Sequence, residues 1–213
     1  MNSRRDKKKT ERKHQILDAA SSLFKEKGYD QTSVDDIAKQ ADIARGTVFY
    51  NFESKEEIVF ALRFRSVDEA KARALAQLSA GVPALKCIEA FIIEVAQWTE
   101  KNPQLAEVLW RIGPIGFKRF LKTEDLNLSE KLESCQPIEG GKTPGPPNLI
   151  PHELILAAQK EKTMRADFPP ERISHHLNFI LIHGQMEWLK GSRTQPLDSY
   201  MLDELKLIRE GIG

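Results

Sequence analysis

The sequence predicts an all-α protein with a tri-helical unit at its N-terminus and a larger helical region behind it. Apolar residues recur at helical spacing along most of the chain, and no segment shows a convincing period of two. Two short helical segments joined by a tight turn follow an amphipathic one within residues 10–60, as in a helix-turn-helix unit. With 213 residues, 40% of them hydrophobic, the chain can bury a core in each part.

The N-terminal unit is predicted from its apolar stripe and its caps. The first helix ends at Gly28, which suits a C-terminal cap. A second, short helix begins at Thr32–Ser33, where a hydroxyl can cap free amide groups. A third covers about residues 44–51, so the helix-turn-helix spans about 33–52. The stripe of the first helix consists of Ile16, Leu17, Ala20, Leu23 and Phe24.

Local signals also delimit the later helices. A capping box at residues 54–57 opens a long fourth helix that ends near Ser79, and Pro83 starts a fifth. Glycine and proline at residues 113–116 are expected to interrupt the next helix. Residues 136–148 hold three Gly and four Pro and are expected to form a loop. Further helices are predicted at about 151–164, 171–190 and 197–210.

The net charge of +1 hides a basic N-terminus. Residues 1–55 carry 12 Lys and Arg against 9 Asp and Glu, and the remainder carries 20 against 22. Seven of the basic residues precede residue 14. A basic arm of this kind suits a polyanion, although a solvated tail has the same composition.

The third helical segment differs from an ordinary core helix. Val48 and Phe52 supply one apolar face, while hydroxyl, amide and guanidinium groups occupy the rest. These are the groups that contact phosphates and base edges. Gly46 lowers helix stability by about 1 kcal/mol relative to alanine, but a small residue is useful where the backbone approaches another surface closely, as in a major groove.

A series of short motifs occupies residues 16–56: Ile16-Leu17-Asp18-Ala19-Ala20, Leu23-Phe24, Gly28-Tyr29, Thr32-Ser33-Val34, Ile37-Ala38, Ala41, Gly46-Thr47-Val48-Phe49-Tyr50-Asn51-Phe52 and Ser54-Lys55-Glu56. In residue type and spacing they resemble the DNA-binding domain of TetR-family transcriptional regulators. The rest of the chain resembles that family only in its helical layout and its last two apolar helices. The resemblance implies a DNA-binding domain with a basic arm at 1–55 and an effector-binding and dimerisation domain at 56–213.

The resemblance also implies which residues contact double-stranded operator DNA. Lys55, at the capped start of the fourth helix, is expected to bind a phosphate. The family often has histidine and tyrosine where Asn51 and Phe49 stand. Asn51 is expected to donate to a phosphate or pair with adenine, and Phe49 to contact a thymine methyl group; packing is the alternative for Phe49 and a solvated charge for Lys55. The complete set is Ser33, Val34, Arg45, Gly46, Thr47, Phe49, Tyr50, Asn51 and Lys55.

The larger domain is expected to bind a small molecule and to join two subunits. The resemblance implies a homodimer through the helices at about 171–190 and 197–210. Two DNA-binding domains related by two-fold symmetry match two DNA half-sites. Ordinary core packing is the alternative for those apolar stripes. A mainly apolar effector is expected, because no cluster of Lys or Arg faces inward among the middle helices. Candidate effector contacts, which are more often core residues, are Phe64, Phe91, Trp98, Trp110, Phe117 and Met186.

Together these features favour a repressor that a mainly apolar effector releases from its operator. The alternative is a TetR-like dimer controlled by a protein partner or lacking an inducer. An enzyme, a cofactor or a metal site is not expected, because nucleophile-elbow, phosphate-loop and metal-ligand spacings are missing from the sequence. The two cysteines, Cys87 and Cys135, do not have the spacing of a disulfide framework or of a zinc site, so neither is expected. With no secretory signal and no long apolar run, a cytoplasmic location is expected and a membrane partner is not.

Overall fold

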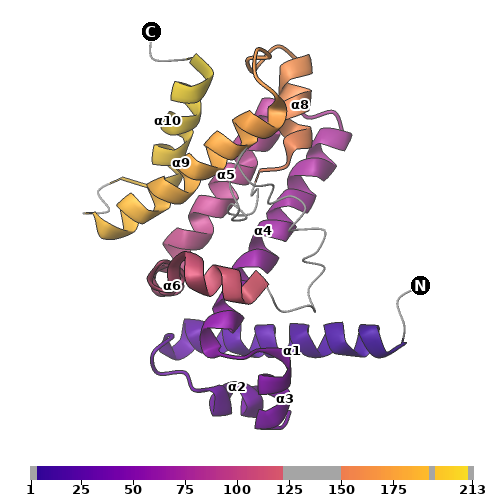
Figure 1. The fold of residues 1–213 in the computed structure, drawn as a ribbon, viewed down its shortest axis with the longest axis vertical. Coiled ribbons are helices and arrows are strands. Elements are labelled where there is room, and N and C mark those ends of the chain that lie inside the picture. The colour runs from indigo at the N-terminus through magenta and orange to yellow at the C-terminus, as the bar shows by residue number, and fades with distance from the viewer. Residues whose placement is uncertain (1–3, 122–149, 192–194, 211–213) are drawn as a thin grey trace. The chain divides into compact units, whose positions relative to one another are not determined.

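The computed structural model describes residues 4–121, 150–191 and 195–210, with side chains in the first range from 8 to 112. Within these ranges it contains nine α-helices and no β-strand, which confirms the predicted class (Figure 1). The loop expected at 136–148 lies outside the described residues. The chain forms two compact units, one from Met1–Arg65 and Asn102–Phe120 and the other from Ser66–Lys101 and Leu121–Gly213.

The first unit contains the three N-terminal helices. Its basic arm is helical, because α1 (Arg4–Lys27) begins within it. Gly28 ends α1 in the left-handed conformation, with φ at +84°, as its predicted capping role requires. Helices α2 (Val34–Gln40) and α3 (Arg45–Asn51) follow, and α2 packs against both α1 and α3.

The core of this unit is mainly apolar, with Thr32 buried among the apolar side chains. Val48 and Phe52 form the buried face of the third segment, as the sequence predicted, with 1% and 3% of their surfaces exposed. The side chains that α1, α2 and α4 (Lys55–Ser79) bury in the same unit include Ile16, Ala20, Ile37 and Ile58.

Reciprocal hydrogen bonds fix the starts of α2 and α4. The Ser33 hydroxyl oxygen accepts from the Asp36 backbone N–H (3.1 Å), and the Asp36 carboxylate accepts from the Ser33 N–H (2.8 Å), which is a complete capping box. At α4, the Ser54 hydroxyl accepts from the Glu57 N–H (3.2 Å). The Glu57 carboxylate accepts from the N–H of Glu53, one residue before the predicted partner.

The expected interruption at residues 113–116 is wrong. Helix α6 (Pro103–Leu121) continues through this stretch. A proline inside a helix removes one backbone hydrogen bond and bends the helix. The hydrogen bonds of the neighbouring turns can still maintain the helix, and α6 continues for about two turns beyond the proline.

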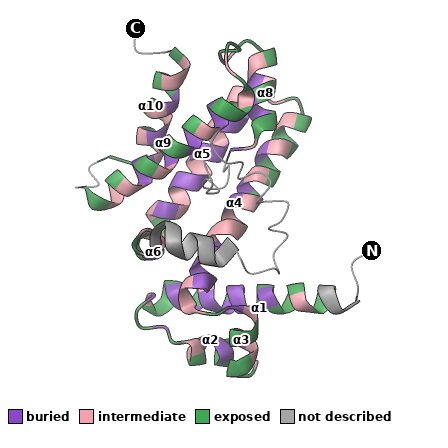
Figure 2. Cartoon of the chain, in the orientation of Figure 1, coloured by how far each residue is buried: buried purple, intermediate pink, exposed green. Residues whose placement is uncertain are grey.

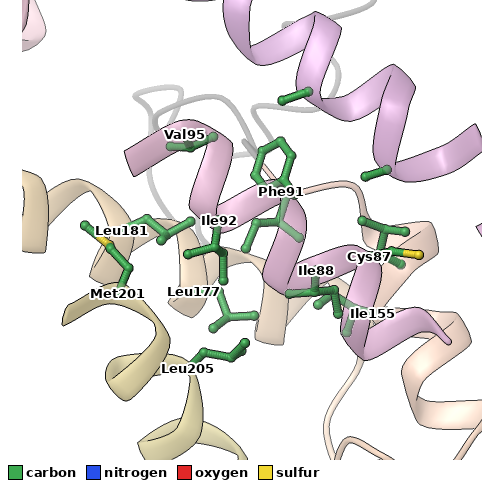
Figure 3. Packing of buried hydrophobic residues seen from close by; sticks show 14 of the residues in the cluster. Cys87, Ile88, Phe91, Ile92, Val95, Ile155, Leu177, Leu181, Met201 and Leu205 are labelled. Carbon is green, nitrogen blue, oxygen red and sulfur yellow. The ribbon is translucent and has the colours of Figure 1, made fainter. Parts of the chain in front are cut away.

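The second unit is built around α5 (Ala84–Lys101). Helices α8 (His152–Lys160), α9 (Pro170–Lys190) and α10 (Leu197–Glu210) all pack against α5. Their bounds lie close to those predicted from the sequence. Figure 3 shows the resulting core, in which α5 is surrounded by side chains of the other helices. It includes Cys87, Ile88, Phe91, Ile92, Val95, Ile155, Leu177, Leu181, Met201 and Leu205.

Three buried polar residues of α9 are hydrogen-bonded inside this apolar core. Ser174 donates to the carbonyl of Ile150 (2.8 Å), and Asn178 accepts from the Ile150 N–H (3.0 Å). Seven residues further along α9, Gln185 accepts from the Thr99 hydroxyl of α5 (2.6 Å). Each bond satisfies a group whose burial without a partner costs about 1–3 kcal/mol. The buried face of α9 therefore has a defined position along its axis.

Gly184 allows α9 and α10 to approach closely. A Cβ atom at this position would lie 2.8 Å from Cε1 of Tyr200 and 3.0 Å from Cε of Met201. Any larger residue would therefore displace α10 or its side chains. No helix in the described ranges combines the length and apolar character needed to cross a membrane.

Candidate nucleic-acid interface

Helix α3 presents aromatic rings to solvent. Tyr50 is 70% exposed and Phe49 is 42% exposed, whereas the preceding residue of the same helix, Val48, is buried. In Figure 2 much of α3 carries the colour of exposed residues, alongside its buried and intermediate positions. Adjacent exposed aromatic residues on a short helix are typical of a binding surface. At Gly46, on the same helix, a Cβ atom would meet no heavy atom within 4 Å, so packing within the chain does not require glycine there.

Arg45 is oriented by weak contacts. Its guanidinium group pairs with Asp35 (3.0 Å) and lies 5.4 Å from the ring centroid of Phe49. Both partners of the ion pair are about 60% exposed. An exposed pair of this kind contributes about 0–1 kcal/mol. Arg45 is therefore held near Phe49 by contacts that a phosphate or a guanine edge can replace.

Asn51 turns back onto its own helix. Its Nδ2 group donates to the Thr47 carbonyl (2.7 Å), and its Oδ1 atom is buried without a hydrogen-bond partner in the described structure. An adenine or phosphate contact, which the sequence predicted for Asn51, would require this amide to change rotamer. Thr47 itself is half-buried, and its carbonyl is occupied by Asn51.

Lys55 braces the turn that precedes α2. Its Nζ atom donates to the carbonyls of Tyr29 (2.8 Å) and Thr32 (2.9 Å) and lies 3.9 Å from the Tyr29 ring centroid. The Tyr29 hydroxyl donates to Glu56 (3.1 Å), and burial together with that carboxylate raises the pKa of Tyr29. An ammonium group has three donors. Two are used within the protein, so the predicted phosphate contact would use the third.

At the start of α2, the polar side-chain groups are already engaged in contacts within the protein. The Ser33 hydroxyl is exposed and bonded to Asp36, and Val34 is half-buried at the first helical position. Lys27 also pairs with Asp36 (3.0 Å). The hydrogen bonds from Ser33 and then Lys27 hold the pKa of Asp36 well below its usual range.

Sequence reasoning did not identify the contacts of α1 with the helix-turn-helix. Gln15 donates to the Ala41 carbonyl at the end of α2 (2.9 Å). Lys9 and Lys13 place their amino groups 6.0 Å from the ring centroids of Tyr50 and Phe52, respectively. The available signal was the helical spacing of residues 9, 13 and 16, which continues the apolar stripe toward the N-terminus.

The candidate effector residues are divided between the two units. Phe64 and Trp110 are half-buried in the first unit, and Trp98 and Met186 are half-buried in the second. Phe91 is 1% exposed and belongs to the core around α5. The side chain of Phe117 lies outside the described residues.

Another basic residue on α4 was not singled out from the sequence. Desolvation lowers the pKa of the Arg63 guanidinium to about 10, so the group remains protonated at neutral pH. Arg63 is half-buried and directly precedes Phe64 on α4.

The two C-terminal helices carry exposed apolar side chains. Phe179 on α9 is 62% exposed and stacks on His183, with 6.1 Å between the ring centroids. Leu207 on α10 is 51% exposed. Leu177, by contrast, is buried at 2% exposure, and Ile180 is half-buried. Leu177 therefore belongs to the core of its own chain, whereas Phe179 lies on the exposed side of α9.

Comparison with known proteins agrees with this geometry. Residues 16–62 match the family model described as bacterial regulatory proteins, tetR family. The biofilm operon icaADBC negative transcriptional regulator IcaR of Staphylococcus epidermidis is 48% identical over 46 residues, and that of Staphylococcus aureus strain Newman is 50% identical over 46 residues. Each alignment covers 22% of this chain, and this chain spans only 25% of the length of these relatives.

Solved structures extend the similarity to nearly the whole chain at the level of the fold. FadR of Thermus thermophilus, a TetR-family transcriptional repressor in complex with lauroyl-CoA, has a TM-score of 0.69 at 20% identity and covers 94% of this chain and 95% of its own. FadR of Bacillus subtilis, in complex with stearoyl-CoA, has a TM-score of 0.58 at 21% identity and covers 94% of this chain and 99% of its own. Each of these relatives and structures is described as a transcriptional regulator. The N-terminal helices therefore match the sequence of the tetR family of bacterial regulatory proteins over residues 16–62, and the described residues share the fold of these solved structures.

Proposed function

We propose that the chain is a ligand-responsive transcriptional repressor that binds operator DNA through α3. The observation that carries this proposal is the exposed pair Phe49 and Tyr50 on the second helix of a helix-turn-helix whose sequence matches the tetR family model. A recognition helix enters the major groove with its exposed side chains against base edges. Arg45 and Gly46 lie on the same helix and suit phosphate or guanine contact and close approach, respectively.

Selection of DNA by the full-length protein tests this proposal. The purified chain is incubated with a pool of random duplexes, and the retained DNA is sequenced and measured in gel shifts. We expect a sequence with two related half-sites, and we expect Tyr50→Ala to weaken its binding at least tenfold. Leu156→Ala is the control, because Leu156 is also an exposed apolar residue (39%) but lies on α8. Recovery of random sequence only, or equal losses in both variants, would contradict the proposal.

The proposal includes a homodimer formed through α9 and α10. Two half-sites on one face of DNA lie about 34–36 Å apart and require two recognition helices related by two-fold symmetry. Phe179 and Leu207 are large apolar side chains that the single chain leaves exposed on these two helices. A second copy of the chain that covered them would bury apolar surface, which stabilises the dimer by about 25 cal/mol for each Å² buried. The DNA itself lies in the cytoplasm of a bacterial cell, and we place the protein there.

We further infer that the effector contains a long apolar chain. Two structures of similar fold are described as complexes with lauroyl-CoA and stearoyl-CoA. The side chains around α5 in the second unit are mainly apolar, so a ligand that enters among them would bury an acyl chain more readily than a wholly polar group. An acyl-CoA also carries charged phosphates, so its polar end would require solvent or cationic side chains. This refines the expectation of a mainly apolar effector.

Calorimetry with defined probes tests the effector class. Lauroyl-CoA, laurate and coenzyme A are each titrated into the protein, with and without the selected DNA. We expect a negative heat-capacity change for the probe that buries its chain. By linkage, DNA must lower the affinity of the protein for that probe by the same factor by which the probe lowers the affinity for DNA, typically about 5–150-fold. Equal affinities with and without DNA would refute release by this ligand and favour control by a protein partner.

A further inference from the structure

The face of α1 that packs onto the helix-turn-helix changes from apolar to basic along the helix. Ile16 and Ala20 on this face are fully buried. One and two turns toward the N-terminus, the same face carries Lys13 and Lys9. Spacings of three and four residues keep side chains on one side of a helix. The basic segment is therefore a helical continuation of a core-forming face, and its direction is set by the packing of α1.

Contacts place this basic face beside the exposed ring of Tyr50 and the buried ring of Phe52. The amino groups of Lys9 and Lys13 lie 6.0 Å from the ring centroids of Tyr50 and Phe52. Lys13 is only 8% exposed, so its stem packs against the unit. Lys8 and Arg12 lie next to these two residues on the helix, and both are exposed.

Glu11 lies between Lys8 and Arg12 in the sequence and offsets only part of their charge. Neither Lys8 nor Arg12 forms an ion pair with a described carboxylate. Like charges four residues apart destabilise a helix. A row of anions at this position would remove that repulsion, and the phosphates of DNA supply such a row.

We propose that Lys8 and Arg12 of α1 bind DNA phosphates next to the groove that α3 enters. This contact is separate from the helix-turn-helix and independent of base sequence, because phosphates carry no direct sequence information. The lysine–ring contacts orient the basic face of α1 relative to Tyr50. The inference rests on the proposed function, since it concerns a second contact with the same DNA.

The salt dependence of binding tests the proposal with a matched pair of variants. Lys8→Ala/Arg12→Ala removes the two exposed cations of α1. Lys101→Ala/Lys160→Ala removes two exposed cations from α5 and α8 and changes the net charge equally. Each lost phosphate contact lowers the slope of log K against log salt by about 0.9. We therefore expect the α1 variant to lower the slope by about 1.8 per subunit and the control to leave it unchanged.

Phosphate ethylation interference locates the contact. In the wild-type complex we expect sensitive phosphates beside each half-site that become insensitive with Lys8→Ala/Arg12→Ala. The variant should keep its preference for operator over random duplex, because it loses only a sequence-independent contact. An unchanged slope and interference pattern, or an equal decrease in the control, would overturn the inference and leave the proposed function intact. A wild-type protein that selects no DNA sequence would overturn both.

Discussion

Replacing Gly46 with alanine separates the demands of folding from those of DNA binding. In the free protein a Cβ atom at this position meets no heavy atom within 4 Å, and the backbone is helical. Alanine is favoured over glycine inside a helix by about 1 kcal/mol, and about half of that is expected at the second residue of α3. For a chain of this size, 1 kcal/mol corresponds to about 2–4 °C in Tm. We therefore expect Gly46→Ala to raise Tm by about 1–2 °C.

The same methyl group should weaken DNA binding. If α3 lies in the major groove with its backbone close to the bases, the added carbon forces the helix outward and lengthens neighbouring contacts. Loss of one good base contact costs about 1–3 kcal/mol. We expect affinity for the selected DNA to fall at least tenfold, which corresponds to about 1.4 kcal/mol.

Gly81→Ala provides the matched control. A Cβ atom at Gly81 also meets nothing within 4 Å, but its φ of +86° is left-handed. Alanine there should lower stability by about 1 kcal/mol and leave DNA binding unchanged. Thermal unfolding and gel shifts on the three proteins provide the measurements. Full affinity in Gly46→Ala would refute close approach of this backbone to DNA, and a decrease in its Tm would refute the open environment of residue 46.

Four further predictions follow from other contacts. Phe179→Glu should shift sedimentation from dimer to monomer with the helical content unchanged, and an intact dimer would exclude this face. Thr99→Val should lower stability by about 1–3 kcal/mol because it removes the hydrogen bond that Thr99 donates to the Gln185 oxygen inside the core, and equal stability in denaturant unfolding would contradict this. Asp36→Asn should destabilise the protein at pH 7. Because the folded-state pKa of Asp36 is depressed, its contribution is fully present above its unfolded pKa of about 3.9 and is lost only as pH falls through the depressed folded-state pKa. The gap between wild type and Asp36→Asn should therefore begin to narrow below about pH 3.9 and continue to narrow as the pH is lowered further, and a constant gap would contradict this. Lys55→Ala should lower both stability and DNA affinity, because two of its donors brace the turn before α2; a loss of affinity alone would show that the brace is dispensable.

The helices were largely predictable because their signals are local. Periodicity, caps and proline positions led to a fourth helix ending at Ser79 and a last helix at 197–210, both as observed. The exception is α6, in which Pro114 and its flanking glycines do not end the helix. A breaker residue indicates a cost of a few kcal/mol, but the sequence does not show which surrounding interactions offset that cost.

The surroundings of the site residues were less predictable because they depend on contacts distant in sequence. The engagement of Lys55 with the Tyr29 and Thr32 carbonyls needs the turn before α2 to lie against the start of α4. Phe91 was a candidate effector contact of a kind that is more often a core residue, and the packing around α5 places it in the core. Exposure of Tyr50 was expected from the pattern of its helix, since Val48 and Phe52 define the opposite, buried face.

The polar residues buried along α9 restrict how the second unit can rearrange. Ser174 and Asn178 hold the backbone of Ile150, and Gln185 holds Thr99 about two turns further along. Sliding α9 by one turn, about 5.4 Å, would separate all three from their partners inside an apolar core. Shear between packed helices is one common route of conformational change, and hinge rotation is another. For α9 the translational route is blocked, so a signal passing through this helix would be carried by tilting about these anchored points.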